Sequence, residues 1–147
     1  MKSKPKKSKA HVLTGEVLRK LLPHFTIIEE ERYDWILRKG YHRLKVDITY
    51  WDTLLLAKAR RYHCDWYIVE LHLCIEVDGD QHQHIVQWSK TMTPQDLCFQ
   101  FEDQQRRDET KRQITKTAAA FLLNIPYGAC SNFDTLTTYI ETKLGEV

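Results

Sequence analysis

The sequence predicts an α/β domain in which helices flank a central mixed sheet of four to five strands. Two observations lead to this fold class. Residues 71–78 alternate apolar and polar side chains with the two-residue period of a strand that is covered on one face. Residues 14–22 and 96–120 instead carry apolar side chains three or four positions apart, as amphipathic helices do. Strand signals placed among helix signals are typical of α/β domains.

The first half of the chain predicts one helix and then short strands. Thr14 can cap the helix, which ends at about Leu22 because Pro23 follows. Strands or hairpin arms are expected next, at residues 25–30, 33–37 and 44–50, with a break at residues 38–40. Residues 53–60 fit either a short helix or a bulged connection.

Two strands joined by a tight turn are expected in the middle of the chain. Residues 62–69 form the first strand and residues 71–78 the second, with the turn near Glu70. In the second strand the odd positions are all apolar, whereas the even positions are mostly polar or ionisable. Glu76 and Asp78 therefore point to the same face of the sheet.

The last third predicts a helix, a strand and a helix. A long polar helix begins at Asp96 or Glu102 and ends near Ala120, and its narrow apolar stripe leaves most of its surface for a partner. A buried strand at residues 121–127 follows. The motif Ser131-x-x-Asp134 resembles a capping box that opens the terminal helix.

Composition and length favour one small domain. The chain has 147 residues, of which 42% are hydrophobic and 29% charged, and this suffices for one core. Residues 1–10 are a basic arm without apolar surface to bury, so we expect them to be disordered and residues 11–147 to form the domain. The arm suits a polyanion or serves as a solubilising tail.

The sequence indicates an intracellular protein with no membrane partner. No apolar run approaches the roughly 18 to 20 residues that cross a bilayer, and no secretory leader opens the chain. The cysteines are expected to be free thiols: Cys64, Cys74, Cys98 and Cys130. A structural zinc site is disfavoured because the nearby His and Cys residues lack metal-ligand spacing.

Carboxylates gather at the end of the second middle strand. If the turn lies near Glu70, antiparallel pairing brings Asp65 close to Glu76 or Asp78. Like charges a few ångströms apart raise each other's pKa, so a divalent cation is the simplest way to stabilise them. Two carboxylates and a backbone carbonyl, such as that of Val77, suffice for Mg²⁺ or Mn²⁺.

These residues form two motifs that resemble a known family. The first reads Arg-Tyr-His-Cys-Asp-Trp-Tyr from Arg61, and the second reads Ile-Glu-Val-Asp-Gly-Asp-Gln-His and ends at His82. Together they resemble the core of the PD-(D/E)-X-K nuclease superfamily, most closely its branch related to very-short-patch repair endonucleases. The motif Asp103-x-x-x-Arg107-Asp108 and residues 122–127 also resemble the region downstream in that branch. The resemblance implies a restriction-endonuclease-like core.

The resemblance also implies roles for five residues. Asp65 and Glu76 would be metal ligands, and Asp78 and His82 would assist metal binding or proton transfer. Glu16 matches a position where many members carry an acid, so it would be an outer or second-site ligand. An equally good interpretation of Glu16 is a favourable charge in the first turn of its helix.

The chain departs from the superfamily pattern at two positions. Cys64 stands where the pattern has proline, which only shapes the strand. Asp78 stands where the pattern has the lysine that orients water and balances charge. His82, a second metal or a lysine of the next helix, such as Lys111, would have to replace that lysine. His82 is the preferred candidate, because the closer branch also relies on a histidine.

We therefore expect a Mg²⁺- or Mn²⁺-dependent endonuclease that hydrolyses DNA phosphodiester bonds with metal-activated water. The residues expected to contact the DNA backbone are Lys4, Lys6, Lys7, Lys9, Arg106, Arg107, Lys111 and Arg112. One alternative is a catalytically silent nucleic-acid-binding or assembly module with the same fold, and another is a nuclease that acts on RNA or branched junctions. The sequence does not distinguish a monomer from a homodimer.

Overall fold

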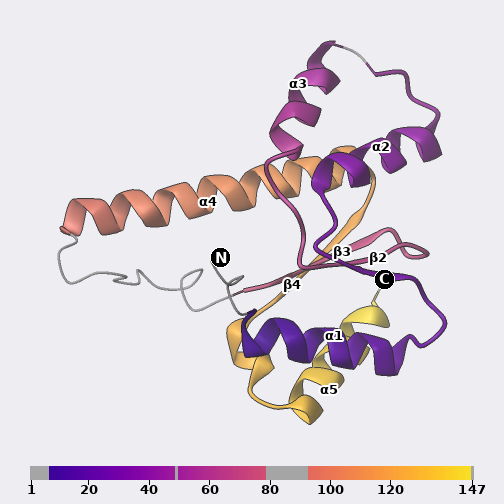
Figure 1. Ribbon diagram of the computed structural model, residues 1–147, viewed down its shortest axis with the longest axis vertical. Coiled ribbons are helices and arrows are strands. Elements are labelled where there is room, and N and C mark those ends of the chain that lie inside the picture. Colours follow the sequence, from indigo (N-terminus) through magenta and orange to yellow (C-terminus); the bar gives the residue numbers. More distant parts are fainter. Residues whose placement is uncertain (1–6, 49, 79–92, 147) are drawn as a thin grey trace, which may run out of the picture.

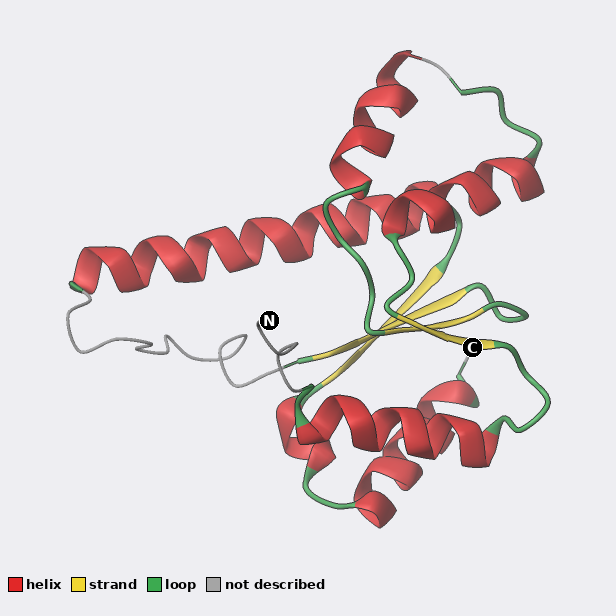
Figure 2. Cartoon of the chain, viewed as in Figure 1, coloured by secondary structure: helices red, strands yellow, loops and turns green. Residues whose placement is uncertain are grey.

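A four-stranded mixed sheet lies at the centre of the computed structural model, which describes residues 7–48, 50–78 and 93–146 (Figure 2). Its strands are β1 (Ile27–Glu29), β2 (Trp66–Ile68), β3 (Leu73–Val77) and β4 (Phe121–Ile125). The spatial order is β1-β2-β3-β4, with antiparallel β1–β2 and β2–β3 pairs and a parallel β3–β4 pair. The predicted α/β class with a mixed sheet is confirmed.

The helices of the described chain cover both faces of this sheet (Figure 1). On one face lie α2 (Tyr33–Leu44), α3 (Tyr50–Ala59) and α4 (Pro94–Thr117). On the other lie α1 (Lys9–Leu21) and α5 (Phe133–Leu144). The short helix η2 (Tyr127–Cys130) connects β4 to α5. The first half of α4 extends well beyond the sheet. Within the described ranges, no helix has the length and apolarity needed to span a bilayer.

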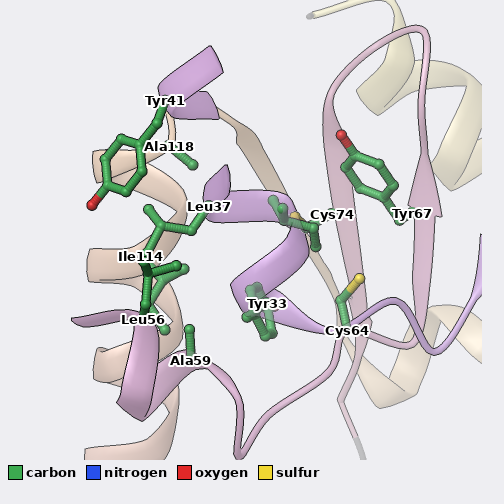
Figure 3. Close-up of a cluster of buried hydrophobic side chains, with 11 residues drawn as sticks. Tyr33, Leu37, Tyr41, Leu56, Ala59, Cys64, Tyr67, Cys74, Ile114 and Ala118 are labelled. Atoms are coloured by element: carbon green, nitrogen blue, oxygen red, sulfur yellow. The ribbon is translucent and has the colours of Figure 1, made fainter. Parts of the chain in front are cut away.

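Each face of the sheet has its own hydrophobic cluster, as the alternation in β3 predicts. Leu73 and Ile75 pack toward α1 and α5, whereas Cys74 packs toward α2 and α4. Figure 3 shows the second cluster, in which Tyr33 and Ile114 are completely buried. Its two thiols, those of Cys64 and Cys74, are free, and a hydrogen bond between them together with burial raises the pKa of Cys64.

The turn between β2 and β3 falls where the sequence predicts it. Trp66 pairs with Ile75 and Ile68 with Leu73, so residues 69–72 form the turn. β2 is shorter than predicted because the chain bends at Asp65. The bend interrupts the strand alternation: Cys64 lies in the α2-side cluster, whereas the two-residue period of an unbroken strand would place it on the face of Trp66.

The region expected to form two strands folds instead as helix α2. The predicted strands at 33–37 and 44–50 and the predicted break at 38–40 are therefore wrong. Tyr33, Leu37 and Tyr41 are buried at helical spacing against α3 and α4. Gly40 is needed for a close helix contact, since a Cβ there would lie 2.3 Å from the carbonyl oxygen of Ala118. Lys45, with φ of 55°, ends the helix.

Helix starts also differ from the prediction. The side chain of Ser8, not of Thr14, caps α1 by accepting a hydrogen bond from the His11 amide (3.1 Å), so α1 already includes Lys9 and Ala10 of the predicted arm. Thr14 is buried in mid-helix and bonds the carbonyl of Ala10.

The later elements show three further differences. Thr93, which forms a capping box with Asp96, opens α4. Asn132 rather than Ser131 caps α5, accepting from Thr135 at 2.8 Å. The strand predicted as buried is β4 at the edge of the sheet, and its Phe121 is 53% exposed. Of the two structures that the sequence allows for residues 53–60, the helix is the one observed, as part of α3.

Candidate functional site

The two carboxylates singled out by the sequence meet across β2 and β3. Asp65 directly precedes Trp66, and Glu76 directly follows Ile75, the partner of Trp66 in the sheet. Asp65 bridges the two strands with its own side chain, since its Oδ2 accepts a hydrogen bond of 2.7 Å from the amide of Val77. The predicted proximity of Asp65 and Glu76 is confirmed.

Glu76 is a largely buried carboxylate, 13% exposed, with two polar partners. Its Oε1 accepts a hydrogen bond of 2.7 Å from the Tyr33 hydroxyl and lies 3.3 Å from Nζ of Lys111. Burial raises the pKa of Glu76 to about 7. Lys111 and Tyr33 oppose this rise, whereas the negative charge of Asp65 adds to it. The charged form of Glu76 is therefore incompletely compensated by the residues around it.

Lys111 reaches Glu76 from helix α4. Ile114 and Thr115, about one turn further along, are the buried residues that anchor this helix. The Lys111 side chain is only 17% exposed and lines the cleft beside Glu76, so it differs from the exposed cations on the outer surface of α4. Among the three replacements considered for the missing lysine, Lys111 is the one in contact with Glu76, while His82 lies outside the described residues.

A cleft of about 230 Å³ opens beside Glu76. Its lining combines acidic, basic and amide side chains: Glu76, Asp78, Asp108, Lys111, Arg112, Leu122 and Asn124. Asp78 shares the cleft with Glu76, as the strand alternation predicts. Asn124 is the direct partner of Glu76 in the β3–β4 register. The cleft therefore places two cationic side chains beside three carboxylates.

Asp65 has a second neighbour that the sequence does not suggest. Its Oδ1 lies 3.5 Å from Nδ1 of His11, on helix α1. The other ring nitrogen of His11, Nε2, lies 3.0 Å from a carboxylate oxygen of Glu29. Lys7 in turn pairs with Glu29 and lies 3.6 Å from Glu30. The hydrogen bonds from Lys7 and His11 lower the pKa of Glu29.

The remaining predicted site residues have different positions. Glu16 lies in the interior of α1 and is exposed, so it is not in the first turn of its helix. Val77 contacts Asp65 through its amide. Within 7–48, 50–78 and 93–146, no group of three His, Cys, Asp or Glu side chains is placed to hold a metal ion. The described part of the fold therefore brings Asp65 and Glu76 of the predicted site near each other without a third acidic, histidine or cysteine metal ligand.

The predicted DNA-contacting residues are partly engaged with acids. Arg107 pairs with Asp103 at 3.3 Å and Arg112 with Glu109 at 2.7 Å, both on the exposed surface of α4. Arg106 lies over the ring of Phe99. Lys9 is exposed at the start of α1, and Lys4 and Lys6 lie outside the described residues.

Sequence reasoning missed three contributors to the site: His11, Tyr33 and Asn124. Tyr33 escaped notice because its helix was predicted to be a strand. The signal for Asn124 is a single polar residue in the apolar run of β4. Nothing in the local sequence around His11 indicates its contact with Asp65, which lies 54 positions later.

Comparisons of the chain with protein-family models, with curated proteins and with solved structures give no match. The geometry of this site is therefore the basis on which a function can be proposed.

Proposed function

We propose that this protein is a metal-dependent endonuclease that hydrolyses DNA phosphodiester bonds on a core of the restriction-endonuclease-like type. One observation carries the proposal: Asp65 lies close enough to Glu76 for its charge to raise the pKa of Glu76, and Lys111 contacts Glu76 at the edge of an open cleft. Two carboxylates and a lysine are the groups that the PD-(D/E)-X-K pattern brings together, here with the lysine supplied by α4.

The chemistry of the donor set fits a hard divalent cation. Asp65 and Glu76 offer carboxylate oxygens, and burial, followed by the charge of Asp65, raises the pKa of Glu76, so a bound cation would stabilise its charged form. Asp65 and Glu76 would hold Mg²⁺ or Mn²⁺, which when bound supplies an activated water and neutralises charge on the phosphate. With no third His, Cys, Asp or Glu ligand in the described residues, water completes the coordination.

The protein's own groups orient these acids. The amide of Val77 fixes one oxygen of Asp65, and the hydroxyl of Tyr33 fixes one oxygen of Glu76. Lys111 can release Glu76 to a cation and donate its own hydrogen bonds to a phosphate oxygen in the cleft. Arg112, at the rim, adds positive charge for the DNA backbone.

Cleavage assays with isosteric variants test the proposal. Supercoiled, single-stranded, mismatched and branched DNA are incubated with Mg²⁺ or Mn²⁺ and wild type, Asp65→Asn or Glu76→Gln. We expect each variant to lose at least about 100-fold in rate, because even residues that only support metal ligands contribute about 10- to 100-fold. Glu141→Gln, at an exposed site on α5, is the matched control and should cleave like wild type. Equal cleavage by wild type and Glu76→Gln would refute the proposal.

The role of Lys111 has its own test. Lys111→Met keeps the length of the side chain and removes the charge, and we expect cleavage to fall at least about 100-fold with DNA binding largely retained. The exposed Lys58→Met, on α3, controls for loss of a single positive charge. If Lys111→Met instead weakens DNA binding and leaves the cleavage rate of bound DNA unchanged, Lys111 contacts the DNA backbone, as the sequence suggests.

A catalytically silent nucleic-acid-binding module is the second candidate. The observation that favours it is the contact of Glu76 with Lys111 and Tyr33, which gives this carboxylate partners without any metal. Calorimetry that finds no Mg²⁺ or Mn²⁺ binding dependent on Glu76, together with intact DNA binding, would favour this module. Cleavage of RNA or of branched junctions alone would keep the enzyme and change its substrate.

A further inference from the structure

The outward side of helix α2 carries a tryptophan and cations at helical spacing. Trp35, Arg38 and His42 follow one another three and four positions apart, so they share one side of the helix, and Arg43 lies beside them. All four residues are exposed, and Trp35 is 50% exposed. The opposite side of α2 packs into the hydrophobic cluster of Figure 3. We call these four residues the α2 stripe.

The cations of the α2 stripe differ from those of α4 in their partners. On α4, Arg107 and Arg112 each pair with an acid of the same helix. Within the ranges that the structure describes, no acid pairs with Arg38, His42 or Arg43. The α2 stripe therefore presents positive charge that is still available to an anionic ligand.

The acids closest to the α2 stripe are already engaged elsewhere. Asp34, the one acid in the sequence of α2, is 2% exposed and accepts hydrogen bonds of 2.6 and 2.9 Å from Arg32. Glu31, just before the helix, is 4% exposed and lies 3.2 Å from Nζ of Lys39. Neither carboxylate would face a ligand on the outward side of the helix.

A hollow of about 570 Å³ adjoins the α2 stripe, between α2 and the β2–β3 turn. Its lining combines cations with an aromatic and an aliphatic side chain: Arg38, Lys39, His42, Arg43, Tyr67 and Val69. The acid at this hollow, Glu70, is held by the amide and hydroxyl of Thr26 at 2.7 to 2.9 Å. A hollow of this size and composition suits a small flat ligand that carries negative charge.

We propose that the α2 stripe binds single-stranded DNA, with a base stacked on Trp35 and backbone phosphates on the cations. Exposed aromatic rings among cations are the arrangement that recognises single strands, because any unpaired base can stack and every phosphate is charged. From Trp35 to Arg43 the helix rises about 12 Å. This length suits about three or four nucleotides at roughly 3.4 Å each, and the hollow can take the last base.

The choice of DNA as the ligand rests on the proposed function. The surface itself is separate from the cleft, because the β2–β3 turn lies at the opposite end of β3 from Glu76. The inference deepens the proposed function by naming its substrate class: DNA that carries unpaired bases beside the position of cleavage.

The same cations also have a structural explanation. Arg43 and His42 lie in the last turn of α2, where positive charge stabilises the helix dipole without any ligand. That explanation gives no role to Trp35 and predicts no effect on DNA affinity. A binding assay therefore separates the two explanations.

The experiment measures DNA affinity by fluorescence anisotropy in EDTA, where no metal-dependent cleavage occurs. The full-length chain is titrated into a labelled oligo-dT of about 12 nucleotides and into the matched duplex. We expect Trp35→Ala to weaken single-strand binding at least about 5-fold with little effect on the duplex, whose bases are already stacked. Trp35→Phe keeps an aromatic ring and should retain most of the affinity.

A salt series tests the cations separately from the tryptophan. Each phosphate contact to a single strand contributes about 0.7 to the slope of log affinity against log salt. The double variant Arg38→Gln/Arg43→Gln should therefore lower this slope by about 1.4, whereas Trp35→Ala should leave it unchanged. Lys20→Gln, at an exposed position of α1 on the other face of the sheet, is the control and should match wild type.

The possible failures are distinguishable. Equal single-strand binding by wild type, Trp35→Ala and the double variant would overturn the α2 stripe as a binding surface, and tighter binding of oligo-U would overturn the choice of DNA. Cleavage of DNA by wild type would then still support the nuclease. Binding that depends on Trp35, without cleavage of any DNA in Mg²⁺ or Mn²⁺, would refute the nuclease and leave the α2 stripe standing.

Discussion

Polar side chains near the two ends of strand β3 lie on the same face of the sheet, but they differ in how completely their surroundings satisfy them. Just before the strand, His72 is 3% exposed, yet both ring nitrogens have partners: the Tyr67 hydroxyl at 2.5 Å and the Ala118 carbonyl at 3.0 Å. Burial lowers the pKa of His72 and so favours the neutral ring that these bonds require. Near the other end, the largely buried Glu76 lies close to Asp65, and burial together with the charge of Asp65 raises the pKa of Glu76.

The difference distinguishes a polar residue whose hydrogen bonds are complete from one that is a candidate for a functional role. A buried group whose hydrogen bonds are complete needs nothing more, and it contributes to stability. A buried carboxylate whose pKa is raised by burial and by a neighbouring charge is held at a cost in stability, and such groups concentrate at functional sites. On this criterion His72 belongs to the core, and Glu76 is a candidate for the proposed site.

The largest expected effect is the pH dependence of stability that Glu76 causes. Its pKa is about 7 in the folded chain against an ordinary 4.5, so between these values the folded chain holds a proton that the unfolded chain has released. The free energy of unfolding should therefore fall as pH rises through this window, by about 3 kcal/mol in total. Urea unfolding in EDTA at pH 4 to 8 measures it.

Glu76→Gln is the control for this profile, because its neutral amide does not titrate. We expect the fall between pH 4.5 and 7 to disappear in the variant, whatever its stability at any single pH. Added Mn²⁺ should restore stability at pH 8 to wild type and not to Glu76→Gln. Parallel profiles for the two proteins would mean that Glu76 ionises in the folded chain as it does in water, and the contrast with His72 would be lost.

The next effect concerns the other end of β3. His72 has a positive φ of 49°, which asparagine tolerates, so His72→Asn changes the side-chain bonds without straining the turn. Loss of these bonds leaves the Tyr67 hydroxyl buried without its partner and should cost about 2 kcal/mol of stability. Cleavage per folded molecule should be unchanged; a specific loss of activity would place His72 in the functional site.

A smaller effect is expected when Tyr33 loses its hydroxyl. Tyr33→Phe removes the hydrogen bond that stabilises the charged form of Glu76, so the pKa of Glu76 should rise further. Stability should fall by about 1 kcal/mol at pH 8 and by less at pH 4, where Glu76 is protonated. A loss that is equal at both pH values would show that the hydroxyl does not distinguish the two forms of Glu76.

The smallest effect belongs to the exposed ion pair near the cleft rim. Arg112 and Glu109 are more than half exposed, and their pair should contribute no more than about 0.5 kcal/mol. A double-mutant cycle with Arg112→Ala and Glu109→Ala measures it. DNA affinity should respond more strongly, with Arg112→Ala weakening binding at low salt, because removing a rim cation weakens phosphate contacts.

The sequence alone determined the strand pair that carries the acids. The period-two pattern of β3, a turn near Glu70 and the antiparallel pairing that follows are local, and they suffice to place Asp65 near Glu76. The same local reading failed for α2, because Gly40 resembles a break in a sequence and becomes a helix contact only when Ala118 packs against it.

Only the tertiary structure decided which groups surround those acids. Lys111, Tyr33 and His11 come from α4, α2 and α1, and each lies at least 35 positions from the carboxylate that it contacts. No periodicity within one element reports such a contact, since it depends on how three helices pack on the two faces of the sheet. The physical reason is that strand pairing follows from neighbouring residues and one turn, whereas the packing of helices depends on the volumes and shapes of distant side chains.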